Sequence, residues 1–159
     1  MQHVEVRNFS FNAGQVMNVT GVPNQNGDRF SINVGHSVDD IALQIDVRFN
    51  FDNSSKQVFF NSCRSGNWHK DHQIAKTFPF DYDKKFKVSI TFTKEQFSVT
   101  LPDESKYQFP NRHGYGKYNF IFLANKVTTH GIEIIYTNQD GLKTIHFRSP
   151  NIFWLLIGF

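Results

Sequence analysis

The chain contains little cysteine and little charge. Among its 159 residues there is one cysteine, Cys63, so a framework of disulfides within the chain is excluded. Such cysteine usage favours a reducing compartment or a protein that is indifferent to redox state. Charged residues make up 19% of the sequence and the formal net charge is +3, with lysines and arginines scattered rather than in a basic run. Nucleic acid is therefore not an expected partner.

Long apolar runs are also scarce. The first residues, MQHVEVRNF, contain no apolar stretch of the kind found in a secretory signal, so signal-directed secretion is not expected. Residues 152–159, IFWLLIGF, are strongly apolar but too few to span a bilayer, so we expect no membrane insertion.

Aromatic residues, in contrast, are abundant. They form 16% of the sequence, and phenylalanine alone contributes 18 residues, which predicts a phenylalanine-rich core. The length is typical of one domain, and the sequence contains no linker, low-complexity segment or internal repeat. We therefore expect a single domain over residues 1–159.

Short alternating segments follow one another along the chain, separated by Gly, Asn, Asp and Pro. No segment has a convincing helical period, so the pattern predicts an all-β sandwich or barrel. The expected strands cover residues 4–11, 16–22, 29–34, 41–51, 57–61, 74–80, 86–93, 96–101, 106–109, 118–125, 131–137 and 142–147.

The expected strand at 41–51 has an unusual polar side. Gln44, Asp46 and Arg48 alternate with apolar residues and so share one face, about 7 Å apart. If the strand at 57–61 pairs with it, Asn61 lies near this row. Amide, carboxylate and guanidinium groups are suited to reading sugar hydroxyls. The alternative is a solvated outer face with an internal Asp46–Arg48 ion pair.

A tryptophan lies in a polar loop directly after Asn61. In the segment FFNSCRSGNWHKD, Trp68 stands among Gly, Asn, His, Lys and Asp. The apolar face of an indole in a solvent-exposed loop is unfavourably hydrated unless another group packs against it, and a sugar ring can do so. The segment indicates a glycan site, and the alternative is a tryptophan folded back onto the core.

Three segments together resemble the galectins. The family signature is a strand H-x-N-x-R, an N on the next strand, and then W-x-x-E-x-R. The matching positions read QIDVR at residues 44–48, Asn61, and WHKDHQ at residues 68–73. The flanking RFSINVG, FFNS, FPF and FPNR also match, and with the opening VRNFSFNAGQ they are most similar to fish galectins of the congerin type. The resemblance covers about residues 3–137.

The resemblance implies a galectin-type jelly-roll β-sandwich of two antiparallel sheets, which binds glycans on its concave sheet without catalysis, metal or cofactor. It also implies β-galactoside preference, non-classical export and a non-covalent homodimer. We therefore expect a homodimeric lectin, cytoplasmic and extracellular, whose partners are galactosides or other hexose-containing glycans. The residues expected to line the site are Gln44, Asp46, Arg48, Asn61, Trp68, Asp71, Arg29 and Gln73.

Four positions depart from the family signature. Gln44 replaces the histidine but can still donate and accept hydrogen bonds. Asp46 replaces the asparagine and, when ionised, only accepts, so we expect it to draw Arg48 into an ion pair. Asp71 is one methylene shorter than the family glutamate, and Gln73 lacks the guanidinium fork of the family arginine. These changes predict weakened lactose binding.

Two functions remain open at this point. The first is a lectin for galactoside-type glycans or for glycans of altered, mannose-type specificity, acting in defence or in cell-surface recognition. The second is a structural or protein-interaction protein of the same fold that has lost sugar binding. Absence of binding to galactosides, mannosides and complex glycans by a folded sample would favour the second.

Enzymatic and metal-binding functions are not expected. His69, His72 and His113 lack the spacing of a zinc site, and Cys63 is more typical of a small buried residue than of a nucleophile. Asp46 and Asp71 could mimic a glycosidase pair, but Arg48 would keep Asp46 ionised.

The sequence after the expected strand at 131–137 forms an unusual apolar extension at about residues 138–159. One interpretation is that residues 142–147 are the usual last strand of the family, displaced by an insertion, with IFWLLIGF as an extra strand. Another is that the apolar tail covers a sheet edge or forms a dimer contact. Because an exposed IFWLLIGF would promote aggregation, we expect it to be buried.

Overall fold

A computed structural model describes residues 3–148, and every regular element within that range is a β-strand. Seven strands form the first sheet, with β8 paired to β6 beside the main path. Their order is β1 (Val4–Val6), β13 (Phe120–Asn125), β4 (Arg29–Ser37), β5 (Asp40–Phe51), β6 (Ser54–Arg64) and β7 (Asn67–Trp68), with β8 at Gln73–Ile74.

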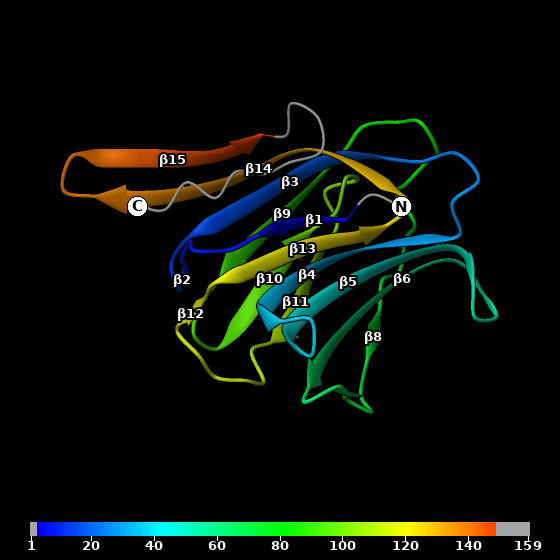
Figure 1. Ribbon diagram of the computed structural model, residues 1–159, viewed down its shortest axis with the longest axis horizontal. Coiled ribbons are helices and arrows are strands. Elements are labelled where there is room, and N and C mark those ends of the chain that lie inside the picture. Colours follow the sequence, from blue (N-terminus) through cyan, green and yellow to red (C-terminus); the bar gives the residue numbers. More distant parts are fainter. Residues whose placement is uncertain (1–2, 149–159) are drawn as a thin grey trace.

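Six strands form the second sheet, which lies against the first to make a sandwich (Figure 1). Their order is β11 (Lys106–Pro110), β10 (Gln96–Thr100), β9 (Phe86–Phe92), β3 (Val16–Pro23), β14 (Val127–Asn138) and β15 (Gly141–Arg148). A short pair, β2 (Phe11–Asn12) with β12 (Lys117–Tyr118), stands apart from both sheets. All pairings are antiparallel, which confirms the predicted all-β sandwich.

Alternation along the strands builds the core between the sheets. On β5, the side chains of Leu43, Ile45 and Val47 are fully buried, while Gln44 and Arg48 on the other face keep contact with solvent. Phenylalanine dominates the buried set, as predicted, with ring contacts such as Phe30 against Phe86 at 5.2 Å between centroids. This packing fixes which face of the seven-stranded sheet points outward.

Two of the expected strands differ most from the structure, and a third, at 118–125, is divided at Asn119 between β12 and β13. Only Gln73–Ile74 is a strand within the expected 74–80, and the following residues are irregular. Pro79 has no N–H for a ladder, and Phe78 and Phe80 are held by packing against Phe49 and Phe30. The expected strand at 4–11 is broken at Asn8, whose φ of 57° is left-handed.

The last described strands form a hairpin. Strand β15 pairs with β14 along its whole length, from Asn138 opposite Gly141 to Gly131 opposite Arg148. The hairpin extends past the other strands at one end of the sandwich (Figure 1). The apolar run at 152–159 lies outside the described residues. Over residues 3–148, no helix is long and apolar enough to cross a membrane.

Candidate functional site

Strands β4, β5 and β6 bring the predicted polar residues together on the outward face of the seven-stranded sheet. Gln44 on β5 lies opposite Asn61 on β6, so the expected pairing is confirmed. Arg29 on β4 lies opposite Arg48 on β5. Directly paired residues point to the same side of a sheet. We call the outward-facing set Arg29, Gln44, Asp46, Arg48 and Asn61 the polar face.

Asp46 is buried at the centre of two ion pairs. Its side chain is 3% exposed, and its two carboxylate oxygens accept from different arginines. Nε of Arg29 donates to Oδ1 at 3.0 Å, and Nε of Arg48 donates to Oδ2 at 2.8 Å. The expected Asp46–Arg48 pair is therefore present, with Arg29 as a second partner. We call these three residues the arginine end.

Two phenylalanine rings contact the guanidinium groups of the arginine end. The carbon of the Arg48 guanidinium lies 4.2 Å from the ring centroid of Phe59, and that of Arg29 lies 4.5 Å from the ring of Phe51. Cation–π contacts of this kind restrict the orientation of a guanidinium. Sequence reasoning missed both rings as site residues, although Phe59 alternates in step with Asn61 and so gave a signal.

Gln44 is oriented by a neighbour on β4. Its Nε2 donates to Oδ1 of Asn33 at 3.0 Å, and Nδ2 of Asn33 donates in turn to Oγ of Ser31 at 2.9 Å. Because this contact uses one N–H of the Gln44 amide, the other N–H and the amide oxygen remain available for a ligand hydroxyl.

Asn61 and Trp68 form what we call the tryptophan end. Trp68 lies opposite Cys63, two residues beyond Asn61 on the same face of β6, and its side chain is 49% exposed. Nδ2 of Asn61 donates to the backbone oxygen of His69 at 3.0 Å, which connects the asparagine to the tryptophan strand. The alternative of a tryptophan folded back onto the core does not hold, and the indole presents a large apolar surface beside polar groups.

A further arginine supports the tryptophan end from the other sheet. Arg112 follows β11, and its Nη1 donates to Oδ1 of Asn61 at 3.3 Å and to Oγ of Ser62 at 3.1 Å. Its Nη2 donates to the backbone oxygen of Asp71. One guanidinium thus fixes Asn61 and the loop after Trp68 together. Sequence reasoning noted FPNR as a family flank but gave Arg112 no role.

The last two predicted residues lie apart from the arginine end. Asp71 is exposed, and its carboxylate makes no hydrogen bond or ion pair with the described residues. Gln73 lies opposite Phe60, whose side chain is buried in the core, whereas Ile74 lies opposite Phe59. The register therefore directs Ile74, rather than Gln73, to the side that carries the polar face.

The histidines and the cysteine are placed as structural groups. In the described part of the chain, no cluster of three or more His, Cys, Asp or Glu side chains could hold a metal. Cys63 is buried, and burial raises the pKa of its thiol, which disfavours the thiolate that a nucleophile needs. His113 is 4% exposed, with Nδ1 at 3.0 Å from Oδ1 of Asp40. Burial lowers the pKa of His113, although Asp40 acts in the opposite direction.

Comparison with known proteins agrees with this geometry. Residues 3–134 match the family model of the galactoside-binding lectins. The chain belongs to this family. It is 42% identical over 134 residues to the beta-galactoside-binding lectin of Electrophorus electricus, a match that covers 84% of this chain and 98% of that protein. The resemblance to galectins is therefore confirmed, and this galectin is a lectin rather than an enzyme.

Solved structures of relatives share the fold. The lactose- and MES-liganded structure of congerin II has a TM-score of 0.80 and 34% identity, and covers 84% of this chain and 99% of congerin II. CG-16, a homodimeric agglutinin from chicken liver, has a TM-score of 0.78 at 25% identity, over 84% of this chain and 99% of CG-16. The similarity to congerin-type lectins is confirmed by these structures.

The family match ends at residue 134, inside β14. Strand β15 lies wholly beyond it, as does the sequence that follows. This position favours an added strand over the alternative of a displaced last family strand.

Proposed function

We propose that this galectin binds galactoside-type glycans on the polar face, with the hexose ring placed over Trp68. The observation that carries the proposal is the tryptophan end, where a half-exposed indole stands beside a fixed asparagine amide on the outward face of the sheet. A sugar has one apolar C–H face and polar edges, so it complements an aromatic plate flanked by hydrogen-bonding groups.

Three residues of the polar face have distinct roles in the proposal. Nε of Arg48 is used by Asp46, and Nη1 donates to Oγ of Ser54 at 3.2 Å, so the remaining N–H groups of its two Nη atoms donate to a hydroxyl and to the ring oxygen. Asn61 contacts the hydroxymethyl group, and Gln44 reads a further hydroxyl with the free part of its amide. The lactose-liganded structure of congerin II supports galactosides as the ligand class.

Calorimetric titration with lactose tests the tryptophan role. Trp68→Ala is expected to weaken binding about fivefold to thirtyfold, equivalent to roughly 1–2 kcal/mol, as is usual for a lost aromatic contact. Trp68→Phe keeps a smaller ring, so its lactose affinity should lie between those of the parent and Trp68→Ala. Because Trp68 is half exposed, the thermal stability of both variants should stay close to that of the parent. Equal lactose affinity in parent and Trp68→Ala would contradict the proposal.

We also propose a changed hexose preference, because the arginine end differs from the family signature. Asp46 offers no amide donor, and both of its oxygens are engaged by arginines. A hexose with a different arrangement of hydroxyls, such as mannose, then binds in addition to galactose. Titration with lactose and mannose, separately and together, tests this idea, which fails if mannose neither binds nor alters lactose binding.

The same observation favours a second candidate function, a galectin-fold interaction protein without sugar affinity. If Arg29 and Arg48 are held by Asp46 too firmly to meet a ligand, the polar face is a structural feature. Absence of calorimetric heat with galactosides, mannosides and complex glycans, in a folded sample, would favour this candidate.

We further propose that the protein forms a homodimer, on the strength of its likeness to homodimeric CG-16. Sedimentation equilibrium with and without lactose measures the mass directly. A monomeric mass at all concentrations would contradict the homodimer but would not contradict the proposed sugar site.

A further inference from the structure

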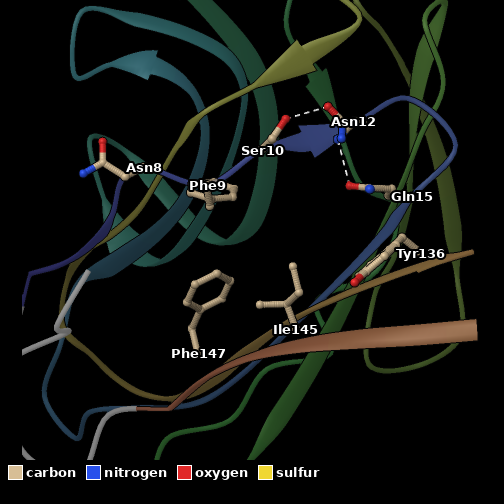
Figure 2. Close-up of a pocket in the computed structure, with 8 residues that line it drawn as sticks. All are labelled: Asn8, Phe9, Ser10, Asn12, Gln15, Tyr136, Ile145 and Phe147. Atoms are coloured by element: carbon tan, nitrogen blue, oxygen red, sulfur yellow. Dashed lines mark hydrogen bonds between the residues drawn. The ribbon is translucent and has the colours of Figure 1, made fainter. Parts of the chain in front are cut away.

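A pocket of about 520 Å³ lies between the N-terminal segment and the β14–β15 hairpin (Figure 2). It shares no residue with the polar face, so it is separate from the proposed glycan site. We call it the edge pocket. It is lined by Asn8, Phe9, Ser10, Asn12, Gln15, Tyr136, Ile145 and Phe147.

The apolar wall of the edge pocket continues the core surface of the six-stranded sheet. Ile145 lies opposite Ile134 and Phe147 opposite Ile132, so all four side chains point to the same side. The two on β14 are fully buried, whereas the two on β15 are only half-buried. Strand β1 is the edge of the facing sheet, so the segment around residues 8–10 lies across from β15.

The N-terminal side of the pocket adds an aromatic ring and a polar rim. The ring centroid of Phe9 lies 5.9 Å from that of Phe147, in an edge-to-face arrangement. On the rim, Ser10 donates to Oδ1 of Asn12 at 2.6 Å, and the backbone N–H of Asn12 donates to Oε1 of Gln15 at 2.9 Å (Figure 2). The rim groups bond to one another, so the apolar wall is the surface that an occupant would contact.

Three of the eight lining residues lie beyond the family match. The match ends at residue 134, and these three are Tyr136, Ile145 and Phe147. The eleven residues that follow the described part, SPNIFWLLIGF, also lie beyond it. Seven of the eleven are large and apolar and none is charged, and at about 3.5 Å per residue they could span the pocket several times over.

We propose that residues 152–159 of the same chain bind in the edge pocket. The segment follows in sequence shortly after β15, which ends at Arg148, one residue after Phe147 on the pocket wall. An exposed run of this composition would promote aggregation, whereas the pocket provides apolar cover near the end of the described chain. The extension thus supplies both the half-buried apolar wall on β15 and the apolar segment proposed to pack against it.

Tryptophan fluorescence of the full chain tests this proposal. The chain has two tryptophans, so Trp68→Phe leaves Trp154, within the proposed segment, as the only one. In that background we expect blue-shifted emission and acrylamide quenching several-fold weaker than that of a free indole. Ile145→Asp, which places a charge on the pocket wall, should shift the emission to the red and raise the quenching several-fold.

The same strand offers a matched control. Leu142 is 72% exposed and does not line the pocket, so Leu142→Asp should leave the Trp154 spectrum unchanged. Tyr136→Asp, on the neighbouring strand, repeats the test from a second wall in case Ile145→Asp fails to fold, as judged by circular dichroism. Trp154 emission that matches a free indole in the parent would overturn the proposal. So would identical spectra in Ile145→Asp, Tyr136→Asp and Leu142→Asp, or a blue shift lost on dilution, which would assign the segment to a second copy.

Discussion

The arginine end and the tryptophan end differ in how many of their polar side-chain groups already bond to other protein groups. At the arginine end, the carboxylate of Asp46 is buried and accepts from both Arg29 and Arg48. At the tryptophan end, Trp68 is half exposed, and Asn61 is oriented by backbone groups and by Arg112. The first end is stabilised from within, whereas the second presents an open surface.

Because of this difference, we expect the arginine end to contribute mainly to the stability of the fold and the tryptophan end mainly to ligand binding. The buried carboxylate at the arginine end replaces an amide of the family signature, and each of its oxygens is paired with an arginine. We infer that ligand affinity rests mainly on the tryptophan end, and that the arginine end determines which hexose is preferred. Substitutions at the two ends should therefore affect different measurements.

The largest expected effect is on stability, from Asp46→Ala. Loss of the carboxylate leaves two guanidinium groups close together without their shared counter-ion. The expected destabilisation is about 2–3 kcal/mol, less than for a fully buried pair because both arginines retain some solvent contact. Urea unfolding measures it. A free energy of unfolding equal to that of the parent would show that the ion pairs contribute little.

Asp46→Asn is the matched control for this substitution. The amide preserves the size of the side chain and restores the donor of the family signature. We expect a smaller loss of stability than in Asp46→Ala, together with a gain in lactose affinity.

The next effect is on affinity, from Arg112→Ala. This change removes the guanidinium that holds Asn61, Ser62 and the backbone of Asp71. We expect lactose affinity to fall about threefold to tenfold, or roughly 0.7–1.4 kcal/mol, by calorimetry. Arg112→Lys keeps the charge but not the fork, so it should recover only part of the loss. Unchanged affinity in Arg112→Ala would mean that Asn61 needs only its backbone partners.

The smallest effect concerns His113, which lies outside both ends. Burial lowers its pKa in the folded state below the ordinary value of 6.5. The unfolded chain therefore binds the proton more readily, so the contribution of neutral His113 is complete above about pH 6.5 and is lost as the pH falls below that value. Urea unfolding at pH 7.5 and 5.5 should show a weaker pH dependence in His113→Gln than in the parent. The same slope in both proteins would assign the dependence to other groups.

The arrangement of the polar face could be predicted in large part from the sequence, because strand alternation is a local property. The alternation in residues 43–49 predicted which side chains of β5 point outward, and the short turn after it predicted that Asn61 lies beside Gln44. The galectin-type all-β sandwich followed from the same alternation together with the family signature.

Interactions between distant segments could not be predicted in the same way. The burial of Asp46 depends on Arg29 from another strand, and the position of Asn61 depends on Arg112 from the other sheet. Gln73 was expected in the site from the family signature, whereas the register of β8 places Ile74 opposite Phe59 and Gln73 opposite Phe60. The strand expected at 74–80 failed because Phe78 and Phe80 are fixed by packing rather than by ladder hydrogen bonds.

The most direct test of the proposed site is an NMR titration of nitrogen-labelled protein with lactose, observed at the indole N–H signals. The chain has two tryptophans, Trp68 in the tryptophan end and Trp154 beyond the described residues, and Trp68→Phe assigns the signals. We expect the Trp68 signal to shift progressively with lactose while the Trp154 signal stays in place. Lactose binding, detected by calorimetry, without movement of the Trp68 signal would contradict the proposed site.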